Sequence, residues 1–225
     1  MLQVTELSYQ YGVNSVLLNV GFELPGGTVA ALVGRNGAGK STLLRCLAGW
    51  TAPMSGTIAF NGRRLRQQER DYQRDVVLVP DTPDFYDELT AWDHLQMVGQ
   101  LHRIGDWKAR SASLLEQFQL ADARGAFPFT FSRGMRYKLA LCMALIVQPP
   151  LLLLDEPFGP LDSLANRLLW QHLQAYGASG RTVLFSSHVL PDGERPGLFL
   201  VLRDKQITPV DPAGVANLAD VLDEE

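Results

Sequence analysis

Residues 34–42 constrain the possible folds of this chain more than any other stretch. They match the phosphate-loop pattern G-x-x-x-x-G-K-S, which requires a strand before it and a helix after it. The apolar run 29–33 and the helical pattern 43–48 supply both. Glycines let successive N–H groups point at phosphate oxygens, and the helix opening at 39–40 adds a positive dipole. The residues predicted to bind a nucleotide here are Gly34, Arg35, Asn36, Gly37, Ala38, Gly39, Lys40, Ser41 and Thr42.

Two acidic residues, Asp155 and Glu156, follow the apolar run 151–154. A buried strand would deliver both carboxylates to the carboxyl edge of the sheet, where the phosphate loop also lies. With ATP as the nucleotide, Lys40 would reach the β- and γ-phosphates, and Ser41 and Asp155 would hold Mg²⁺. Glu156 is predicted to polarise the water that attacks the γ-phosphate.

A second candidate anion site lies at Ser132 and Gly134, directly before the helical pattern 134–147. A hydroxyl and a backbone N–H at a helix start can bind a phosphate, although taken alone these residues are an ordinary helix cap. Two phosphate sites so far apart on one chain suggest that two chains share each nucleotide.

Composition excludes several other classes of protein. The chain has 225 residues, a net charge of −4 and no block of lysine or arginine, so a nucleic-acid partner is not expected. Cys46 and Cys142 lie in apolar helical patterns and are expected to be buried, reduced thiols. We expect no signal peptide and no membrane-spanning helix, because the apolar segment 139–154 is interrupted by Gln148, Pro149 and Pro150. Any role at a membrane would then require a partner.

The predicted fold class is α/β, a P-loop NTPase core with a mixed sheet, N-terminal antiparallel strands and an inserted all-helical lobe. We expect one domain, 1–225: an α/β core at 1–87 and 146–210, a helical lobe at 88–145, and a C-terminal helix with an acidic tail at 211–225. Within the lobe, apolar stripes predict two helices, the second opened by a cap at Asp106. The expected strands are 2–9, 16–23, 29–33, 57–60, 75–79, 151–154, 182–186, 198–202 and 206–210, and helices are also expected at 163–176 and 212–222.

Over residues 2–207 the chain resembles the ATP-binding subunits of ATP-binding cassette (ABC) transporters. That family has a Leu-Ser-Gly-Gly-Gln signature loop, where this chain has Phe131-Ser132-Arg133-Gly134-Met135. This variant resembles the ATPases of drug, antibiotic and polysaccharide exporters. The resemblance implies ATP-driven pairing with a second copy or a homologous ATPase subunit. It also implies a transmembrane permease subunit as partner, and a cytoplasmic location on the inner face of the cell membrane.

The resemblance also assigns roles to single residues. Tyr11 would stack on adenine, Asp162 would contact the opposite subunit, and His188 would contact the γ-phosphate as a catalytic residue. The permease would dock near residues 84–87, although the aromatic residues there could equally pack internally.

The chain departs from the family pattern at two further places. Asp81 stands where the family usually has a glutamine that links Mg²⁺ to the membrane subunit. An aspartate can ligate Mg²⁺, so Asp81 joins the predicted metal set, unless it turns away. Residues 191–197 contain two prolines where relatives have a helical turn, and we expect a surface loop there.

Three alternatives remain open at the level of sequence. The chain could be a soluble, non-transport ABC ATPase of translation or DNA repair, although it has neither a tandem cassette nor an inserted coiled coil. It could be a regulatory nucleotide-binding module without turnover. Within transport, it also resembles haem-exporter ATPases.

Overall fold

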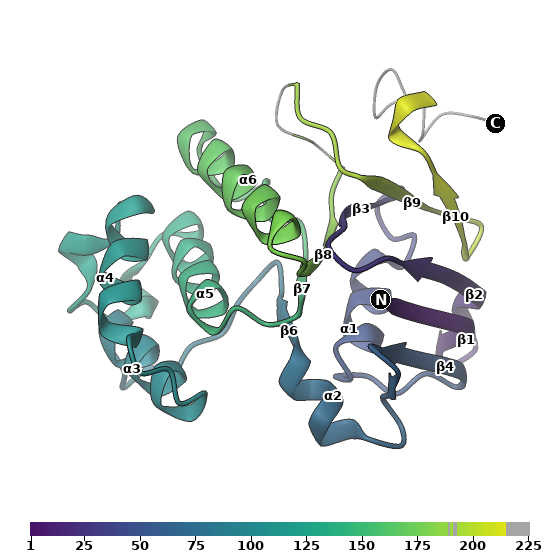
Figure 1. The fold of residues 1–225 in the computed structure, drawn as a ribbon, viewed down its shortest axis with the longest axis horizontal. Coiled ribbons are helices and arrows are strands. Elements are labelled where there is room, and N and C mark those ends of the chain that lie inside the picture. The colour runs from purple at the N-terminus through teal and green to yellow at the C-terminus, as the bar shows by residue number, and fades with distance from the viewer. Residues whose placement is uncertain (189, 191–192, 215–225) are drawn as a thin grey trace.

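Two sheets and a group of helices build the fold in the computed structural model, which describes residues 1–188, 190 and 193–214. The strands lie on one side of the molecule, and the helices α3, α4 and α5 lie on the other (Figure 1). The first sheet is antiparallel and has the order β2-β1-β4-β5. Its strands are β1 (Leu2–Tyr11), β2 (Asn14–Leu24), β4 (Ser55–Phe60) and β5 (Arg63–Arg64).

The second sheet has the order β10-β9-β3-β8-β7-β6. All of its neighbouring strands run parallel except β10, which pairs antiparallel with β9. Its strands are β3 (Val29–Val33), β6 (Val76–Val79), β7 (Leu151–Leu154), β8 (Thr182–Ser186), β9 (Leu198–Arg203) and β10 (Gln206–Val210).

The helices connect these strands. They are α1 (Lys40–Leu47), α2 (Glu69–Asp75), α3 (Ala91–Leu101), α4 (Trp107–Gln117), α5 (Arg133–Val147) and α6 (Ser163–Ala178). Short 3₁₀ turns lie at Ala121–Ala123, Pro128–Thr130 and Pro212–Gly214.

The core lies on both faces of the second sheet. Successive side chains of a strand point to opposite faces, so β7 divides its four leucines between two clusters. Leu152 and Leu154 pack with residues of α5 and α6, whereas Leu151 and Leu153 pack with α1 and the antiparallel sheet. Burial on both faces explains why this strand is apolar throughout rather than alternating.

The predicted fold class is confirmed, with differences at element boundaries. Asp75 was expected to open a strand, but it is the last residue of α2, a helix that the sequence analysis did not predict. The sequence of α2 is polar, and its buried residue is Tyr72. The helix therefore has no apolar stripe from which it could be predicted. Asp106 precedes α4 as expected, but its carboxylate accepts from Arg110 instead of capping the helix.

The C-terminal expectations fall mostly outside the described residues. Residues 212–214 form a 3₁₀ turn rather than the start of an α-helix, and 215–225 lie beyond the described part of the chain. The described residues of the 191–197 segment, 193–197, contain neither helix nor strand. The domain boundaries themselves stay a prediction.

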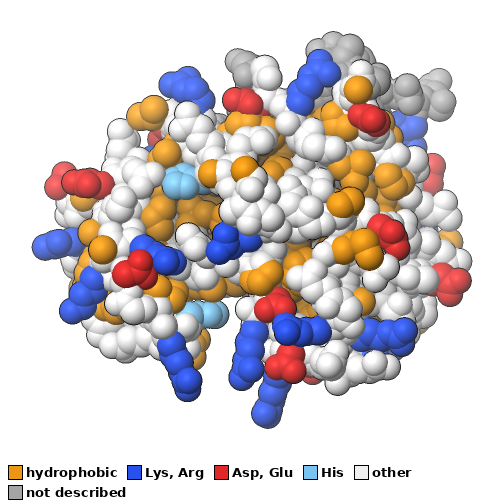
Figure 2. Space-filling view, viewed as in Figure 1, with side chains coloured by type: hydrophobic (Ala, Val, Ile, Leu, Met, Phe, Trp, Pro, Cys, Tyr) orange, Lys and Arg blue, Asp and Glu red, His pale blue; other side chains and the backbone are white. Residues whose placement is uncertain are grey.

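The surface carries charges of both signs. Figure 2 shows basic and acidic side chains scattered over the face in view, with apolar patches between them. Within 1–188, 190 and 193–214, every helix is too short or too polar to cross a membrane. Both cysteines are buried and free, as expected, and burial raises the pKa of the Cys46 thiol to about 11.

Candidate nucleotide-binding site

The carboxyl ends of three parallel strands bring the predicted site residues together. In the register of the sheet, Leu32 of β3 pairs with Ser186 of β8, and Leu154 of β7 pairs with Phe185. The phosphate loop follows β3, His188 follows β8, and the two predicted acids follow β7. All three segments therefore emerge side by side at one edge of the sheet.

Steric contacts explain why glycine stands at two positions of the phosphate loop. A Cβ at Gly34 would lie 2.6 Å from the carbonyl oxygen of Leu202. Gly39, at φ 112°, precedes α1 directly, and a Cβ there would lie 2.8 Å from Cγ1 of Val16. The loop thus packs tightly against β9 on one side and β2 on the other. Its outer residues, 35–37, face solvent.

Lys40 is a buried cation with two oxygen partners. Its side chain is 6% exposed, and Nζ donates to the carbonyl oxygen of Gly34 at 2.9 Å. The same Nζ lies 3.3 Å from Oε1 of Glu156. The structure therefore joins the phosphate loop directly to one of the two predicted acids.

Ser186 links both predicted acids. Its buried hydroxyl donates to Oδ1 of Asp155 at 2.7 Å and accepts from the backbone N–H of Glu156 at 2.9 Å. The hydroxyl of Tyr137 also donates to the carbonyl oxygen of Asp155, and burial raises the pKa of that phenol, so it remains a donor. Sequence reasoning missed Ser186, because a serine at the end of a buried strand carries no distinguishing pattern.

His188 fixes the second oxygen of Glu156. The distance from His188 Nδ1 to Glu156 Oε2 is 2.8 Å, and the backbone N–H of His188 donates to the same oxygen at 3.3 Å. Glu156 itself has φ 47°, in the left-handed region that few residues other than glycine adopt. A strained backbone that holds a carboxylate between a lysine and a histidine is typical of a functional position.

The residues at this edge fit a small divalent cation held mainly by its substrate. Mg²⁺ binds oxygen ligands, commonly one or two carboxylates completed by water and phosphate. Asp155 is buried, and its bond to Ser186 engages one of its two oxygens. Ser41 lies in the first turn of α1 beside Lys40. No cluster of three or more metal-ligating side chains occurs among the described residues.

Tyr11 lies at the end of β1, on the hairpin that contacts the phosphate loop through Val16. Its side chain is 49% exposed, and its ring meets that of Tyr9 edge to face at 4.9 Å between centroids. A half-exposed aromatic ring can stack on a base.

Ser132 and Gly134 lie on a different part of the chain, at the start of α5. The Ser132 hydroxyl caps the helix by accepting from the N–H of Met135 at 3.2 Å. A Cβ at Gly134 would lie 2.8 Å from the carbonyl oxygen of Pro160, so this glycine also has a steric role that the sequence did not reveal.

Two ion pairs connect residues of α5 to other parts of the chain. Arg133 Nη2 lies 2.7 Å from Asp81 Oδ1, and Lys138 Nζ lies 2.8 Å from Asp162 Oδ2. The hydrogen bond from Lys138 and that from the N–H of Ala165 lower the pKa of the Asp162 carboxyl. Asp162 therefore caps α6 as well as pairing with α5.

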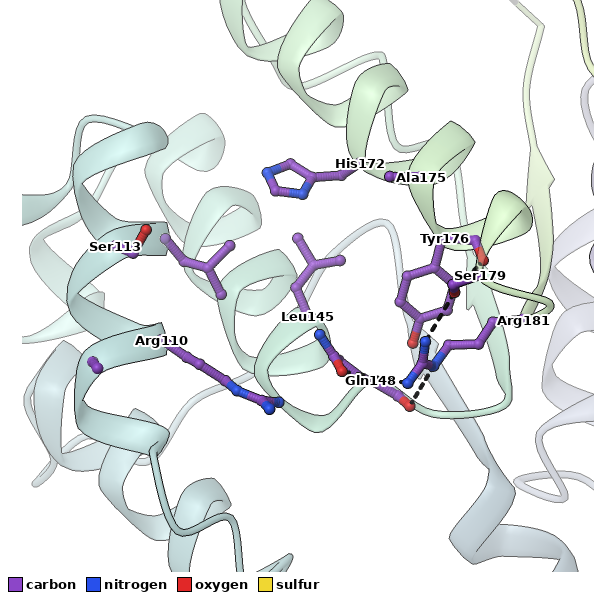
Figure 3. A pocket seen from close by; sticks show the side chains of 11 residues that line it. Arg110, Ser113, Leu145, Gln148, His172, Ala175, Tyr176, Ser179 and Arg181 are labelled. Carbon is purple, nitrogen blue, oxygen red and sulfur yellow. Dashed lines mark hydrogen bonds between the residues drawn. The ribbon is translucent and has the colours of Figure 1, made fainter.

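A cavity of about 530 Å³ lies away from this site (Figure 3). Its walls come from α4, α5 and α6, and Arg181 in its lining precedes β8, so the cavity adjoins the amino ends of the strands. Arg110 and Arg181 donate to the carbonyl oxygens of Ile146 and Gln148. These arginines satisfy the C-terminus of α5, and the cavity is not part of the nucleotide site.

Comparisons with known proteins agree with this geometry. The family model described as "ABC transporter" matches residues 17–159. The ABC-type transporter ATP-binding protein EcsA of Bacillus subtilis is 33% identical over 92% of this chain and 85% of its own length. The Nod factor export ATP-binding protein I of Rhizobium meliloti is 33% identical over 86% of this chain and 58% of its own length.

Among solved structures, an ATP-binding subunit of an ABC transporter superposes with a TM-score of 0.87. It shares 34% sequence identity, and the match covers 94% of this chain and 90% of that one.

Proposed function

This chain belongs to the ABC transporter family as an ATP-binding subunit, and on that premise we propose that it hydrolyses ATP to power a membrane permease. The observation that carries the proposal is the convergence of Lys40, Asp155, Glu156 and His188 at one sheet edge. A buried lysine beside a phosphate loop, with two acids and a histidine opposite, is suited to phosphoryl transfer to water.

The phosphate loop and Tyr11 would bind the nucleotide. Residues 34–42 would surround the phosphates with backbone N–H groups, and Lys40 would exchange its carboxylate partner for the β- and γ-phosphates. Tyr11 would stack on the base from the adjacent hairpin. The exposure of its ring and the place of its hairpin beside the loop support this role.

Ser41 and Asp155 would hold Mg²⁺, whereas the Asp81 carboxylate pairs with Arg133 and so turns away from the metal. A bound Mg²⁺ neutralises charge on the transferring phosphates. The chain's own contribution is to orient Asp155, which it does through the buried hydroxyl of Ser186.

Glu156 would act as the general base, and His188 would orient it as well as contact the γ-phosphate. Lys40 and His188 engage different oxygens of this carboxylate. When a triphosphate attracts Lys40, Oε1 is released toward water while His188 retains Oε2. The base would thus be freed by the substrate itself.

Two chains would share each nucleotide. Arg133 of the signature loop contacts Asp81 beyond β6, and β6 lies three strands from β3, or about 14 Å across the sheet. Ser132 and Gly134 would therefore bind the γ-phosphate held by a second copy or a homologous subunit, with Asp162 at the contact between chains. Hydrolysis would remove the shared phosphate and reopen the pair.

A permease would dock beside Phe85 and Tyr86. The Tyr86 side chain is 61% exposed, and its backbone N–H donates to Nε2 of His94, which also packs against the Phe85 ring. Docking would place the chain at the inner face of the cell membrane. The variant signature loop and the export function in the name of the Nod factor relative support transport outward.

The test compares ATP hydrolysis and oligomeric state in the native chain and in Glu156→Gln. We expect turnover by the native chain, its loss in Glu156→Gln, and an ATP-dependent dimer of the variant. Equal turnover in both would reject Glu156 as the base. Absence of turnover in the native chain, even with its permease, would favour a regulatory module. A Glu156→Gln chain that stays monomeric with saturating ATP would reject the shared site.

A further inference from the structure

Two positions at which this chain differs in charge from the usual family pattern are in contact. Asp81 replaces a glutamine and Arg133 replaces a glycine, and their side chains form an ion pair with Nη2 and Oδ1 2.7 Å apart. The positions are 52 residues apart, one following β6 and the other opening α5. The contact thus joins the segment after β6 to the first turn of α5, where the signature loop lies.

This ion pair is easily exchanged. The Arg133 side chain is 66% exposed and that of Asp81 is 38% exposed. Exposed pairs of this kind contribute little, because water and salt screen both charges. A guanidinium carries five donors in a fixed fork, and the bond to Asp81 uses one of them. A ligand with several anionic oxygens can therefore outcompete a single carboxylate.

Arg133 stands between the two residues proposed to contact the nucleotide of a second chain. Ser132 on one side is exposed, and Gly134 on the other is held against Pro160. An anion bound by both of them would therefore lie on the same helical turn as Arg133, whose side chain is long and exposed. Arginine binds phosphate oxygens bidentately, which makes it suited to a terminal phosphate.

We propose that Arg133 is a phosphate-binding residue of the shared site, and that Asp81 holds its guanidinium in place while no nucleotide-loaded partner is present. This inference rests on the proposed function, since it needs two chains to share one ATP. Asp81 compensates the extra positive charge of the lone chain, and the triphosphate takes over that role when the pair closes.

The test measures ATP-dependent dimerisation by sedimentation in the Glu156→Gln background, at saturating ATP and Mg²⁺. Arg133→Gln should weaken the dimer about 10- to 100-fold, the range for loss of hydrogen bonds to a charged group. ATP affinity of the dilute monomer should not change, because Arg133 acts on the other chain's nucleotide. The matched control is Arg136→Gln, which removes a charge from the same helical turn where Arg136 donates to the Pro83 carbonyl oxygen.

Asp81→Asn provides an independent arm. It removes the resting partner, so the dimer at saturating ATP should become several-fold tighter, and this gain should disappear when Arg133→Gln is also present. A purely structural ion pair would instead make both single variants weaken the dimer alike, and that result would overturn the inference. So would an unchanged dimer in Arg133→Gln. If the Glu156→Gln parent does not dimerise at all, the proposed function fails instead.

Discussion

Lys40 and Glu156 form an ion pair at the edge of the second sheet, with Nζ and Oε1 3.3 Å apart. The lysine that should bind phosphate and the acid that should activate water are thus mutual partners until a substrate separates them. The pair keeps a buried cation from being left without a counter-charge, which would be unfavourable.

A consequence is that Glu156→Gln should bind ATP more tightly than the native chain. The substitution removes the carboxylate that competes with phosphate for Lys40, so we expect a Kd about two- to fivefold lower, roughly the value of one partly exposed ion pair. Binding to dilute monomer measures this without dimerisation. An affinity several-fold weaker than native would show that the carboxylate supports binding.

The same substitution, serine to alanine, should have opposite effects at two buried sites. Ser186→Ala leaves an oxygen of Asp155 and the N–H of Glu156 without their partner, and should destabilise the chain by about 1–3 kcal/mol. Ser111 is buried in α4, and its hydroxyl has no hydrogen bond among the described residues. Ser111→Ala should therefore be stabilising by about 0.5–1 kcal/mol, helped by the higher helix propensity of alanine.

Urea unfolding of both variants measures the difference, and ATP turnover adds a second readout. Turnover should fall in Ser186→Ala, whose hydroxyl orients Asp155, and stay native in Ser111→Ala. Equal stabilities for the two variants would contradict the network described for Ser186.

Gly134→Ala should be destabilising, since its Cβ would lie 2.8 Å from the carbonyl oxygen of Pro160. We expect a loss of about 1–2 kcal/mol as helix and loop move apart, and weaker ATP-dependent pairing. Gly125→Ala is the control, because a Cβ there meets nothing within 4 Å. Thermal unfolding of the two variants measures this difference. A midpoint for Gly134→Ala equal to that of the native chain would contradict the close contact.

Stability should decline as the pH falls through the range of histidine titration. Burial lowers the pKa of His172, which packs against Phe118 and bonds to Gln117. The unfolded chain, with a His pKa of about 6.5, then binds more protons than the folded one, so stability is full above that pH and is lost below it.

His102 shifts in the same direction, so the measurement compares native chain with His172→Gln between mildly acidic and neutral pH. The difference in free energy of unfolding between His172→Gln and the native chain should shift in favour of the variant as the pH falls. A difference that stays constant would mean that His172 keeps its ordinary pKa.

Asp81→Gln, which restores the residue usual in the family, should retain ATP hydrolysis. The Asp81 carboxylate pairs with Arg133, so Asp155 and Ser41 should still hold the metal in this variant. A fall in turnover greater than about a hundredfold, or about 2.7 kcal/mol of activation free energy, would indicate that the carboxylate itself is required.

Sequence patterns predicted the residues of the nucleotide site better than the packing and ion-pair contacts around it. Lys40, Asp155 and Glu156 could be brought together in advance because parallel strands end at a common edge. The contact between Asp81 and Arg133 could not, because a separation of 52 residues says nothing about distance without the orientation of α5. The steric role of Gly134 against Pro160 depends on how two loops pack, which no local pattern encodes.

The outer strands of the two sheets are poorly suited to aggregation by strand addition. One outer strand is β5, which consists of two exposed arginines. Another is β10, where Pro209 has no N–H to offer to an incoming strand. Both borders are poor templates for accidental strand addition. Strand addition at these two borders is thus disfavoured, so it would not compete with the proposed pairing through the loops of the nucleotide site.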